Sequence, residues 1–320
     1  MHCELVVPGL FASGGTSRFA ALELLLARGR RSAGEAKALE CWVQEAFELG
    51  EGVYPAGALT LAAQGIDPGA DSWARADPVH LRVMDDQLIV LPAETFALRA
   101  EESRALCEAL NAHFAGMEFG MAQPRRWYVK LGQIEESRPA LDAAGTALEL
   151  PKQTAPLLNE IQMVLHSHPV NEAREARGEP PVNSLWLWGA GRAPRTRAPW
   201  QSVAADDPAV LGAARLANAR QRALPRSAGE WLERLPEDGR HLAVLDALRA
   251  PLALAADTVQ NEMQALESDW FAPLLAALRR GRIGMVTLHV PDAAEALSFE
   301  IIRGDLRRFW RRPRSIKNYA

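Results

Sequence analysis

The chain has 320 residues, of which 48% are hydrophobic and 24% are charged, and this is the usual balance of a globular protein. Its formal net charge is −4, so no overall positive field draws it to nucleic acid or to a membrane surface. The three cysteines, Cys3, Cys41 and Cys107, have no CxxC spacing, which argues against a disulfide framework and against a zinc site.

Targeting signals are the next feature to consider. The first residues lack the basic region of a secretory signal, and the sequence contains no uncharged apolar run of membrane-spanning length. We therefore expect a cytoplasmic protein that makes no membrane contact.

The first third of the chain predicts one strand followed by helices. Residues 4–11 are typical of a buried strand, because they are nearly all apolar. Leucines and phenylalanine at helical spacing predict helices over 17–29 and 34–49, and residues 57–64 are a candidate third helix. The loop-rich stretch 65–73 is then a candidate domain boundary.

The middle third predicts a mixture of strands and helices. Two short apolar runs, 79–83 and 87–91, predict a hairpin that turns at Asp85–Asp86. A helix over 100–115, a strand over 125–131 and a helix over 154–166 follow. Asn171 is then the expected N-cap of a short helix that stops at Gly178, and a strand is expected at 184–189.

Beyond Gly191 the pattern returns to alternating buried strands and helices. The predicted elements are strands at 201–205 and 241–248, a long helix at 258–279 and a strand at 283–290. The order of elements indicates an α/β protein that contains an α+β unit in its middle third.

The stretch 166–191, HSHPVNEAREARGEPPVNSLWLWGAG, is the least generic part of the chain. Arg174 and Arg177 are three residues apart on the short helix and share a face, so their guanidinium groups could hold a phosphate or carboxylate close to the helix start. The alternative, which residue chemistry alone favours, is a solvated helix face whose arginines pair with Glu172 and Glu175.

Other features of this stretch have structural explanations. His166 and His168 are two residues apart and cannot easily clasp one ion, either on a helix or on a strand. Trp186 and Trp188 lie on one face of a strand that is apolar on both faces, which favours core packing.

Further candidate anion ligands lie on the two strands of the middle third. His80 and Arg82 alternate on one strand close to Asp77, and they could contact a carboxylate; an exposed hairpin face is the equal alternative. Arg126 shares a face of the strand 125–131 with Tyr128 and forms a weaker version of the same site.

The C-terminal run RRFWRRPRSIK, residues 307–317, is the only dense basic segment. Its arginines and aromatic rings are a composition that single-stranded nucleic acid can bind through phosphate contacts and stacking. Because the chain as a whole is acidic, we expect instead a solvated tail in which Phe309 and Trp310 serve as anchors, and we do not expect nucleic acid as a partner.

The stretch 166–191 resembles the HPxN…R…G…PxNxxWLWGxG run of the archaeal-type, cofactor-independent phosphoglycerate mutases of the alkaline phosphatase superfamily. The matching residues are His168, Pro169, Asn171, Arg174, Gly178, Pro181, Asn183, Trp186, Leu187, Trp188, Gly189 and Gly191. The chain is also similar to a bacterial branch of that group that is usually called phosphoglycerate-mutase-like or regulatory.

The resemblance implies an alkaline-phosphatase-like α/β core, with a mixed or parallel sheet flanked by helices, built from residues 1–70 and 184–320. A smaller α+β substrate-type domain would be inserted over residues 71–183. Within the motif, His168, Asn171 and Asn183 join Arg174 and Arg177 as candidate ligands of an anion.

The chain departs from the family pattern where the catalysis of the mutases resides. That mechanism needs a nucleophilic serine and two divalent ions held by Asp and His side chains. The positions expected to supply them hold instead Pro8–Gly9, Glu23, Asp257 with Glu262, and His289 with Asp292, while Ser13 and Ser17 fit an ordinary loop. The resemblance therefore assigns no metal ligand and no catalytic residue.

Three hypotheses follow from these observations. The first is a catalytically silent relative of the mutases without a cofactor, which senses a phosphorylated small molecule or docks a partner protein. The second is an active 2,3-bisphosphoglycerate-independent phosphoglycerate mutase, or a metal-dependent phosphatase, with two Mn or Zn ions. The third is a nucleic-acid-binding regulator that uses the C-terminal arginines.

Overall fold

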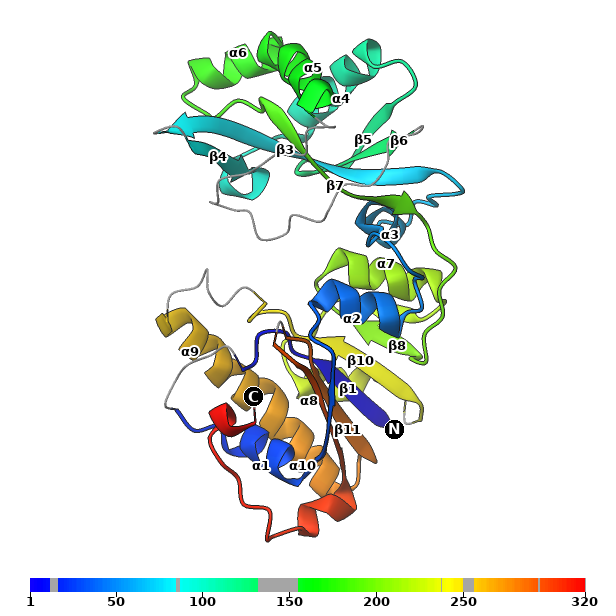
Figure 1. The fold of residues 1–320 in the computed structure, drawn as a ribbon, viewed down its shortest axis with the longest axis vertical. Coiled ribbons are helices and arrows are strands. Elements are labelled where there is room, and N and C mark those ends of the chain that lie inside the picture. Colours follow the sequence, from blue (N-terminus) through cyan, green and yellow to red (C-terminus); the bar gives the residue numbers. More distant parts are fainter. Residues whose placement is uncertain are drawn as a thin grey trace. The chain divides into compact units, whose positions relative to one another are not determined.

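The computed structural model describes residues 1–11, 17–84, 87–131, 155–236, 238–249, 256–292 and 294–319. The chain forms two compact units, and each has a hydrophobic core of its own (Figure 1). We call Met1–Gly50 with Arg195–Ala320 the discontinuous unit, and Glu51–Pro194 the inserted unit.

The discontinuous unit is built on a mixed sheet. Its described strands lie in the order β2-β12-β11-β1-β10-β8-β9, in which β11, β1, β10, β8 and β9 are parallel and β12 is antiparallel to both of its neighbours, β11 and β2. Their bounds are β1 His2–Val6, β2 Arg30–Gly34, β8 Ser202–Ala204, β9 Arg220–Arg222, β10 Arg240–Val244, β11 Met285–Val290 and β12 Ala296–Ile302.

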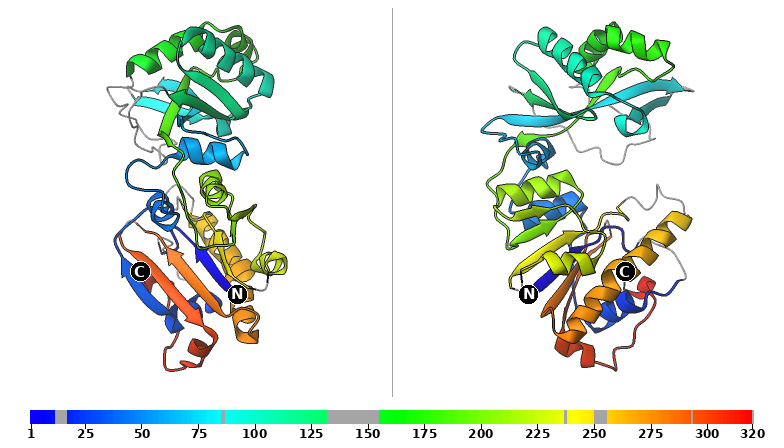
Figure 2. Two further views of the ribbon diagram at one scale, coloured as in Figure 1. Left: turned by 90° about the vertical axis from the view of Figure 1, so that its right-hand side faces the viewer. Right: turned by 180° about the vertical axis from the view of Figure 1, so that it is seen from behind.

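Alternation along the central strand β1 divides its side chains between two different environments. Cys3 and Leu5 belong to the hydrophobic core, together with side chains of α1, α8 and α10. His2 and Glu4 point to the opposite face of the sheet. Helices α9 and α10 run along one face (Figure 2).

The described helices of the discontinuous unit are α1 Ala20–Arg28, α2 Leu39–Ala46, α7 Pro208–Leu216, α8 Ala228–Arg234, α9 Ala256–Ala265 and α10 Ala272–Arg280. A π-helical turn, Leu266–Phe271, joins α9 to α10, so the predicted long helix exists with a bulge inside it. The bulge brings Glu267 to the start of α1, where its carboxylate accepts hydrogen bonds from the Ala21 and Leu22 amides, at 2.6 and 3.1 Å.

The inserted unit contains an antiparallel sheet in which β3 pairs with β4, β6 and β7, and β5 pairs with β6. Its strands are β3 Ser72–Met84, β4 Gln87–Pro92, β5 Glu118–Gln123, β6 Arg126–Leu131 and β7 Ser184–Arg192. The expected hairpin is present as β3 and β4, while its turn at Asp85–Asp86 lies outside the described residues.

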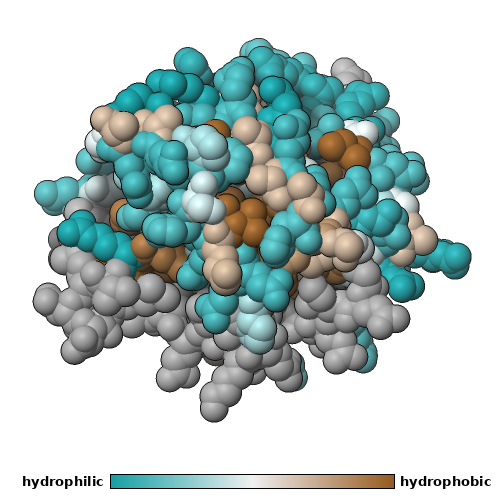
Figure 3. Space-filling model, turned by 90° about the horizontal axis from the view of Figure 1, so that it is seen from above, coloured by the Kyte–Doolittle hydropathy of each residue, from teal (hydrophilic) through white to brown (hydrophobic). Residues whose placement is uncertain are grey.

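Helices cover this sheet on both faces (Figure 1). On one face are α4 Ala100–His113, α5 Ala155–His166 and α6 Pro169–Ala176, and α3 Ala56–Ala63 packs against β3 and β7 on the other. Seen from the side of α4, α5 and α6, the surface is mostly hydrophilic, with apolar side chains in separate spots (Figure 3). Such scattered spots are normal for the outer face of a covering helix.

Several elements were not predicted from the sequence, namely β2, β5, β9, β12, α7 and α8. All five residues of β2 are exposed, so the strand has no apolar pattern and exists because it pairs with β12. The predicted helix over 34–49 starts too early, because Gly34 still belongs to the strand that pairs with β12. The helix α2 begins only at Leu39. The predicted N-cap Asn171 was also wrong, because His168 caps α6.

The fold class expected from the sequence is confirmed, namely an α/β core with a mixed sheet and a smaller α+β unit inserted into it. The expected boundaries at 70/71 and 183/184 differ from the division of the structure at 50/51 and 194/195, because α3 and β7 pack within the inserted unit. Among the described residues, no helix is long and apolar enough to cross a bilayer.

Candidate functional site

An arginine lies among carboxylates at the carboxyl edge of the parallel strands in the discontinuous unit. Open α/β sheets generally bind their ligands at this edge. Arg249, in the turn after β10, donates to Asp207 Oδ2 at 2.9 Å and also to the carboxylate of Glu40 on α2. We call Glu40, Asp207, Asp246 and Arg249 the edge cluster.

The carboxylates of the edge cluster repel one another. Burial, together with the negative charge of Asp207 and Asp206, raises the pKa of Asp246. The second oxygen of Asp207 is occupied as well, because it accepts hydrogen bonds from the Ala209 and Val210 amides and so caps α7. The Arg249 guanidinium is therefore the cation that balances this group.

The donor set does not fit a pair of divalent ions. In the part of the chain that the structure describes, no three His, Cys, Asp or Glu side chains are gathered in a way that could hold an ion. Two ions would need several free carboxylate or imidazole ligands, whereas the oxygens of Asp207 serve a helix cap and a guanidinium.

The positions where the resemblance places metal ligands are used differently. Glu23 is buried in α1 and accepts hydrogen bonds from Arg18 Nε at 2.8 Å and from Arg18 Nη2 at 2.5 Å. Asp292 accepts a hydrogen bond from the Ala294 amide. Asp257 and Glu262 lie on α9. Ser13, a residue of the first loop, lies outside the described residues.

A second polar cluster lies on the face of the sheet opposite the hydrophobic core. Glu4, only 2% exposed, accepts from Arg240 Nε at 2.8 Å and lies 3.2 Å from His289 Nε2 and 3.6 Å from His2 Nδ1. Burial opposes ionisation of this carboxylate, but the hydrogen bonds from His289 and Arg240 outweigh it and lower the pKa of Glu4 to about 2. We call these four residues the Glu4 cluster.

Histidine rings connect the Glu4 cluster to its surroundings. His2 Nε2 lies 2.8 Å from Thr287 Oγ1, and burial lowers the pKa of His2. The ring of His289 lies 5.3 Å from the ring of Trp42 on α2. His289 is thus turned to Glu4 and Trp42 within the unit, rather than to the edge cluster.

The motif residues His168 and Asn171 hold the backbone around α6. The Nδ1 atom of His168 accepts a hydrogen bond from the Val170 amide. Asn171 is 2% exposed; it donates to the Leu165 and Val182 carbonyls and accepts from the Val182 amide. Both side chains serve the local fold, and their expected role as anion ligands stays a prediction.

The structure corrects the interpretation of Arg174 as part of a solvated helix face paired with Glu172 and Glu175. Its side chain is fully buried and donates to Glu102 Oε2 and to the Ala97 carbonyl, both at 2.8 Å, and to the Pro180 carbonyl at 2.9 Å. Because all of these acceptors belong to the protein, the enclosed guanidinium offers no exposed donor to an anion.

Arg177 lies on the outer side of the same ion pair. It donates to Glu102 Oε1 and to Glu179 Oε2, both at 2.7 Å, and is 36% exposed. The expected pairing with Glu175 is therefore replaced by pairs with residues of α4 and of the loop after α6. The arrangement gives no support to an anion pocket on this helix.

Asn183 and His80 join β3 to the segment before β7. Asn183 accepts from the Leu81 amide at 2.7 Å and donates to the Leu81 carbonyl at 2.9 Å. His80 Nδ1 lies 2.9 Å from the Pro181 carbonyl. These side chains form hydrogen bonds to backbone groups of the neighbouring segment, as a paired strand would. They therefore continue the pairing of β3 with β7 beyond the start of β7.

Arg82 and Arg126 are the two candidate arginines for which the described residues show no ion pair. Arg82 is exposed on β3 and Arg126 is half-buried on β6. Asp77 does not share the face of His80 and Arg82. It accepts hydrogen bonds from Arg75 and from Trp188 Nε1, while the Arg75 guanidinium lies over the Tyr128 and Trp188 rings.

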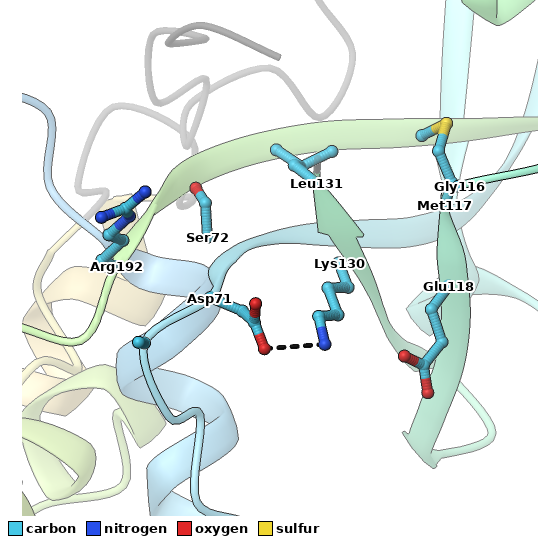
Figure 4. Close-up of a pocket in the computed structure, with 9 residues that line it drawn as sticks. Asp71, Ser72, Gly116, Met117, Glu118, Lys130, Leu131 and Arg192 are labelled. Atoms are coloured by element: carbon cyan, nitrogen blue, oxygen red, sulfur yellow. Dashed lines mark ion pairs between the residues drawn. The ribbon is translucent and has the colours of Figure 1, made fainter. Parts of the chain in front are cut away.

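A pocket of about 380 Å³ lies in the inserted unit where β3 begins and β6 and β7 end. Figure 4 shows the Lys130 and Asp71 side chains facing each other, at 2.7 Å between Nζ and Oδ2, with Glu118 and Arg192 on the lining. The hydrogen bond to Asp71 raises the pKa of Lys130. We call this site the Lys130 pocket.

Sequence reasoning identified neither the edge cluster, nor the Glu4 cluster, nor the Lys130 pocket. Each joins residues that are far apart in the chain, such as Glu4 with Arg240, or Glu40 with Arg249. The one local signal was Asp207 followed by Pro208, which is typical of a helix N-cap after a strand.

The prediction that Phe309 and Trp310 anchor the C-terminal segment was wrong. Phe309 and Trp310, the expected anchors, are 76% and 65% exposed. Ile316 is buried in their place, and the Tyr319 ring packs against the Phe299 ring.

Curated relatives match part of the chain. A probable 2,3-bisphosphoglycerate-independent phosphoglycerate mutase of Geobacter sulfurreducens is 30% identical over 150 residues, which is 43% of this chain and 38% of that protein. The 2,3-bisphosphoglycerate-independent phosphoglycerate mutase of Methanosarcina barkeri is 33% identical over 111 residues, or 31% of this chain and 28% of that protein. The matched regions thus span 38% and 28% of the length of these relatives. No protein-family model matches.

Solved structures match almost the whole chain. The cofactor-independent phosphoglycerate mutase of Thermoplasma acidophilum gives a TM-score of 0.54 at 16% identity and covers 95% of this chain and 90% of its own. The PH0037 protein of Pyrococcus horikoshii gives 0.60 at 12% identity, covering 94% and 87%. The chain is therefore related to cofactor-independent phosphoglycerate mutases and has their fold.

Proposed function

We propose that this chain is a catalytically silent relative of the cofactor-independent phosphoglycerate mutases, of the bacterial regulatory branch to which the chain is similar. The observation that carries the proposal is the salt-bridged Arg249 between Glu40 and Asp207. It places a fixed organic cation at the sheet edge where ligands of α/β proteins bind.

The chemistry of phosphoryl transfer explains why this arrangement is inactive. Divalent ions lower the pKa of the attacking hydroxyl and neutralise charge on the moving phosphoryl group. A guanidinium can neutralise charge, but it has no open coordination position for a substrate oxygen. With Asp207 committed to α7 and Arg249, and Glu40 to Arg249, the edge cluster has too few free ligands for two ions.

An isomerisation assay with 3-phosphoglycerate tests the proposal. The full chain is assayed with added Mn²⁺ and with a chelator, and its metal content is measured in parallel. The Thermoplasma acidophilum mutase serves as the positive control. We expect no turnover above background under either condition and no bound ion. Chelator-sensitive turnover, with two ions per chain, would establish the active mutase instead.

We also propose that the inserted unit binds a phosphorylated hydroxy acid in the Lys130 pocket. The pocket volume falls within the range of small-molecule sites. Lys130 and Arg192 supply cations for a phosphate or carboxylate, and Glu118 can accept a hydrogen bond from a hydroxyl. The anion role expected of Arg174 and Arg177 is thereby moved to charged residues that line an open pocket.

Thermal-shift titrations with 3-phosphoglycerate and with inorganic phosphate test this binding role. We expect 3-phosphoglycerate to raise the melting temperature of the native chain more than phosphate does. Arg192→Ala should remove most of that increase, while Arg104→Ala, which removes an exposed arginine elsewhere in the same unit, should leave it unchanged. Equal responses of the two variants would refute the pocket assignment.

A further inference from the structure

The C-terminal segment has two solvent-exposed aromatic side chains. Phe309 and Trp310 are among the most exposed large hydrophobic side chains of the described residues, at 76% and 65%. Their rings meet edge to face, with 5.3 Å between centroids. Leaving two such rings in water forgoes the stabilisation that burial would give. Adjacent exposed aromatics of this kind are typical of a binding surface.

The backbone that presents these rings is fixed to the discontinuous unit. Arg308 bonds Asp305 at 2.8 Å and donates to the Arg28 carbonyl at 3.4 Å, and Arg311 donates to the Gly29 carbonyl at 3.0 Å. Ile316 is buried beyond them. Because contacts on both sides of the rings hold the chain, their exposure is a feature of the fold rather than of a loose end.

Positive charge is concentrated around the rings. Residues 301–320 contain seven cations (Arg303, Arg307, Arg308, Arg311, Arg312, Arg314 and Lys317) and one acid, Asp305, so the net charge of this segment is 7 − 1 = +6. The whole chain has a net charge of −4, which leaves −10 for the other residues. At physiological salt, charges interact mainly within about 8 Å, so the segment presents a basic surface despite the acidic total.

Two further arginines extend this basic surface. The 3-10 helix Arg303–Arg307 packs against α10, which ends in Arg279 and Arg280 (Figure 1). Both are exposed, as are Arg303 and Arg307. In the described structure Asp305 is the one acid paired within the segment, and it takes a single arginine, Arg308. We call the segment 303–314 with Arg279 and Arg280 the arginine–aromatic surface.

We propose that the arginine–aromatic surface binds single-stranded nucleic acid, with guanidinium groups on the phosphates and a base stacked on Trp310. Surplus unpaired arginines suit a ligand with one negative charge per unit length, and exposed rings between them suit unstacked bases. An acidic protein segment would use the charges but not the ring faces. A bilayer would need a larger apolar area than two side chains provide.

The test is fluorescence anisotropy of the full chain with a labelled oligothymidylate of about 20 nucleotides, titrated between about 50 and 200 mM salt. We expect affinity that falls with salt. Trp310→Ala should weaken binding roughly ten-fold, the effect of losing one stacked base. Arg312→Ser with Arg314→Ser, two exposed arginines, should weaken binding and reduce the salt slope by about 1.4, since each phosphate contact on a single strand contributes about 0.7.

Matched controls separate this surface from general charge effects. Arg215→Ser with Arg220→Ser removes the same charge from exposed positions on α7 and β9 of the same unit, and this variant should bind like the native chain. Anionic vesicles and polyglutamate are titrated as competing partners. The proposal is overturned if Trp310→Ala binds the oligonucleotide as well as the native chain does, or if vesicles or polyglutamate bind more tightly in a Trp310-dependent way. All of the substituted residues are exposed, so unchanged melting temperatures confirm that the variants fold.

Discussion

Glu4 shows how a buried carboxylate stays ionised on the polar side of the sheet. Its folded pKa is about 2, against a usual value of 4.5. A carboxylate with a lowered folded pKa stabilises the protein above its usual pKa, and this contribution is lost as the pH falls from about 4.5 to about 2. The shift corresponds to about 3 kcal/mol of stability at neutral pH.

We therefore expect Glu4→Gln to lower the free energy of unfolding at pH 7 by about 3 kcal/mol and to flatten its fall between about pH 4.5 and pH 2. Denaturant melts at several pH values measure both effects. A Glu4→Gln profile parallel to that of the native chain would contradict the assigned pKa.

Arg249 offers a second test at a single residue, because it separates charge balance from metal binding. Arg249→Met should destabilise the discontinuous unit, since Glu40 and Asp207 lose their shared cation and a half-buried charge left unpaired costs up to about 3–5 kcal/mol. We expect Mn²⁺ to raise the melting temperature of this variant and to have no effect on the native chain. A native chain that Mn²⁺ stabilises strongly would contradict the role given to Arg249.

Residue types could be predicted from the sequence more readily than their partners. The motif residues Asn171 and Arg174 stood out because of their spacing and surroundings. Both side chains are buried and form hydrogen bonds within the protein. The sequence around Arg174 does not indicate that Glu102, 72 positions away, forms its ion pair. A buried arginine stabilises the fold and is not accessible to a ligand. The burial of Arg174 depends on the packing of α4 against α6.

At the scale of elements, apolar periodicity predicted α1, α4 and β11 well, because each buries one side in a core. It missed β2 and β9, whose exposed or half-exposed residues form strands through pairing with a neighbour. It also missed α7, whose start is fixed by the cap that Asp207 provides. Strand pairing between distant segments is invisible to a local pattern, whereas the Asp207–Pro208 cap of α7 is a local signal that apolar periodicity does not detect.

The packing of α3 makes a prediction at this scale, because it depends on the absence of a side chain. A Cβ at Gly57, the second residue of α3, would lie 2.3 Å from the Trp73 carbonyl oxygen. Gly57→Ala must therefore push α3 away from β3, and we expect a loss of about 1–3 kcal/mol in the free energy of unfolding.

Gly229 provides the matched control for this substitution. It is also the second residue of a helix, α8, and a Cβ there would lie 3.6 Å from Ser227 Oγ, an ordinary contact. Gly229→Ala should be neutral or stabilise the chain by up to about 1 kcal/mol, because alanine is the better helix former. Denaturant melts of the two variants settle the point, and equal losses would refute the close approach of α3.

For the whole molecule, the important feature is that each unit has its own core. Every residue of one core cluster lies in the discontinuous unit, and every residue of the other lies in the inserted unit. The family resemblance implied an inserted domain, and the loop-rich stretch 65–73 agreed with its first boundary. The boundaries could not be placed closely, since α3 and β7 follow their packing partners rather than the composition of the loop.

Separate cores predict that damage to one unit stays within it. Arg174→Met removes the buried partner of Glu102, and we expect hydrogen exchange to speed up across residues 51–194 by the equivalent of about 3–5 kcal/mol. Amides of β1, β10 and β11 should keep their native protection. Arg177→Met, which breaks the half-exposed side of the same pair, should change exchange by less than about 1 kcal/mol. Faster exchange of β1 in the Arg174 variant, to the same extent as in the inserted unit, would mean that the two cores unfold as one cooperative whole.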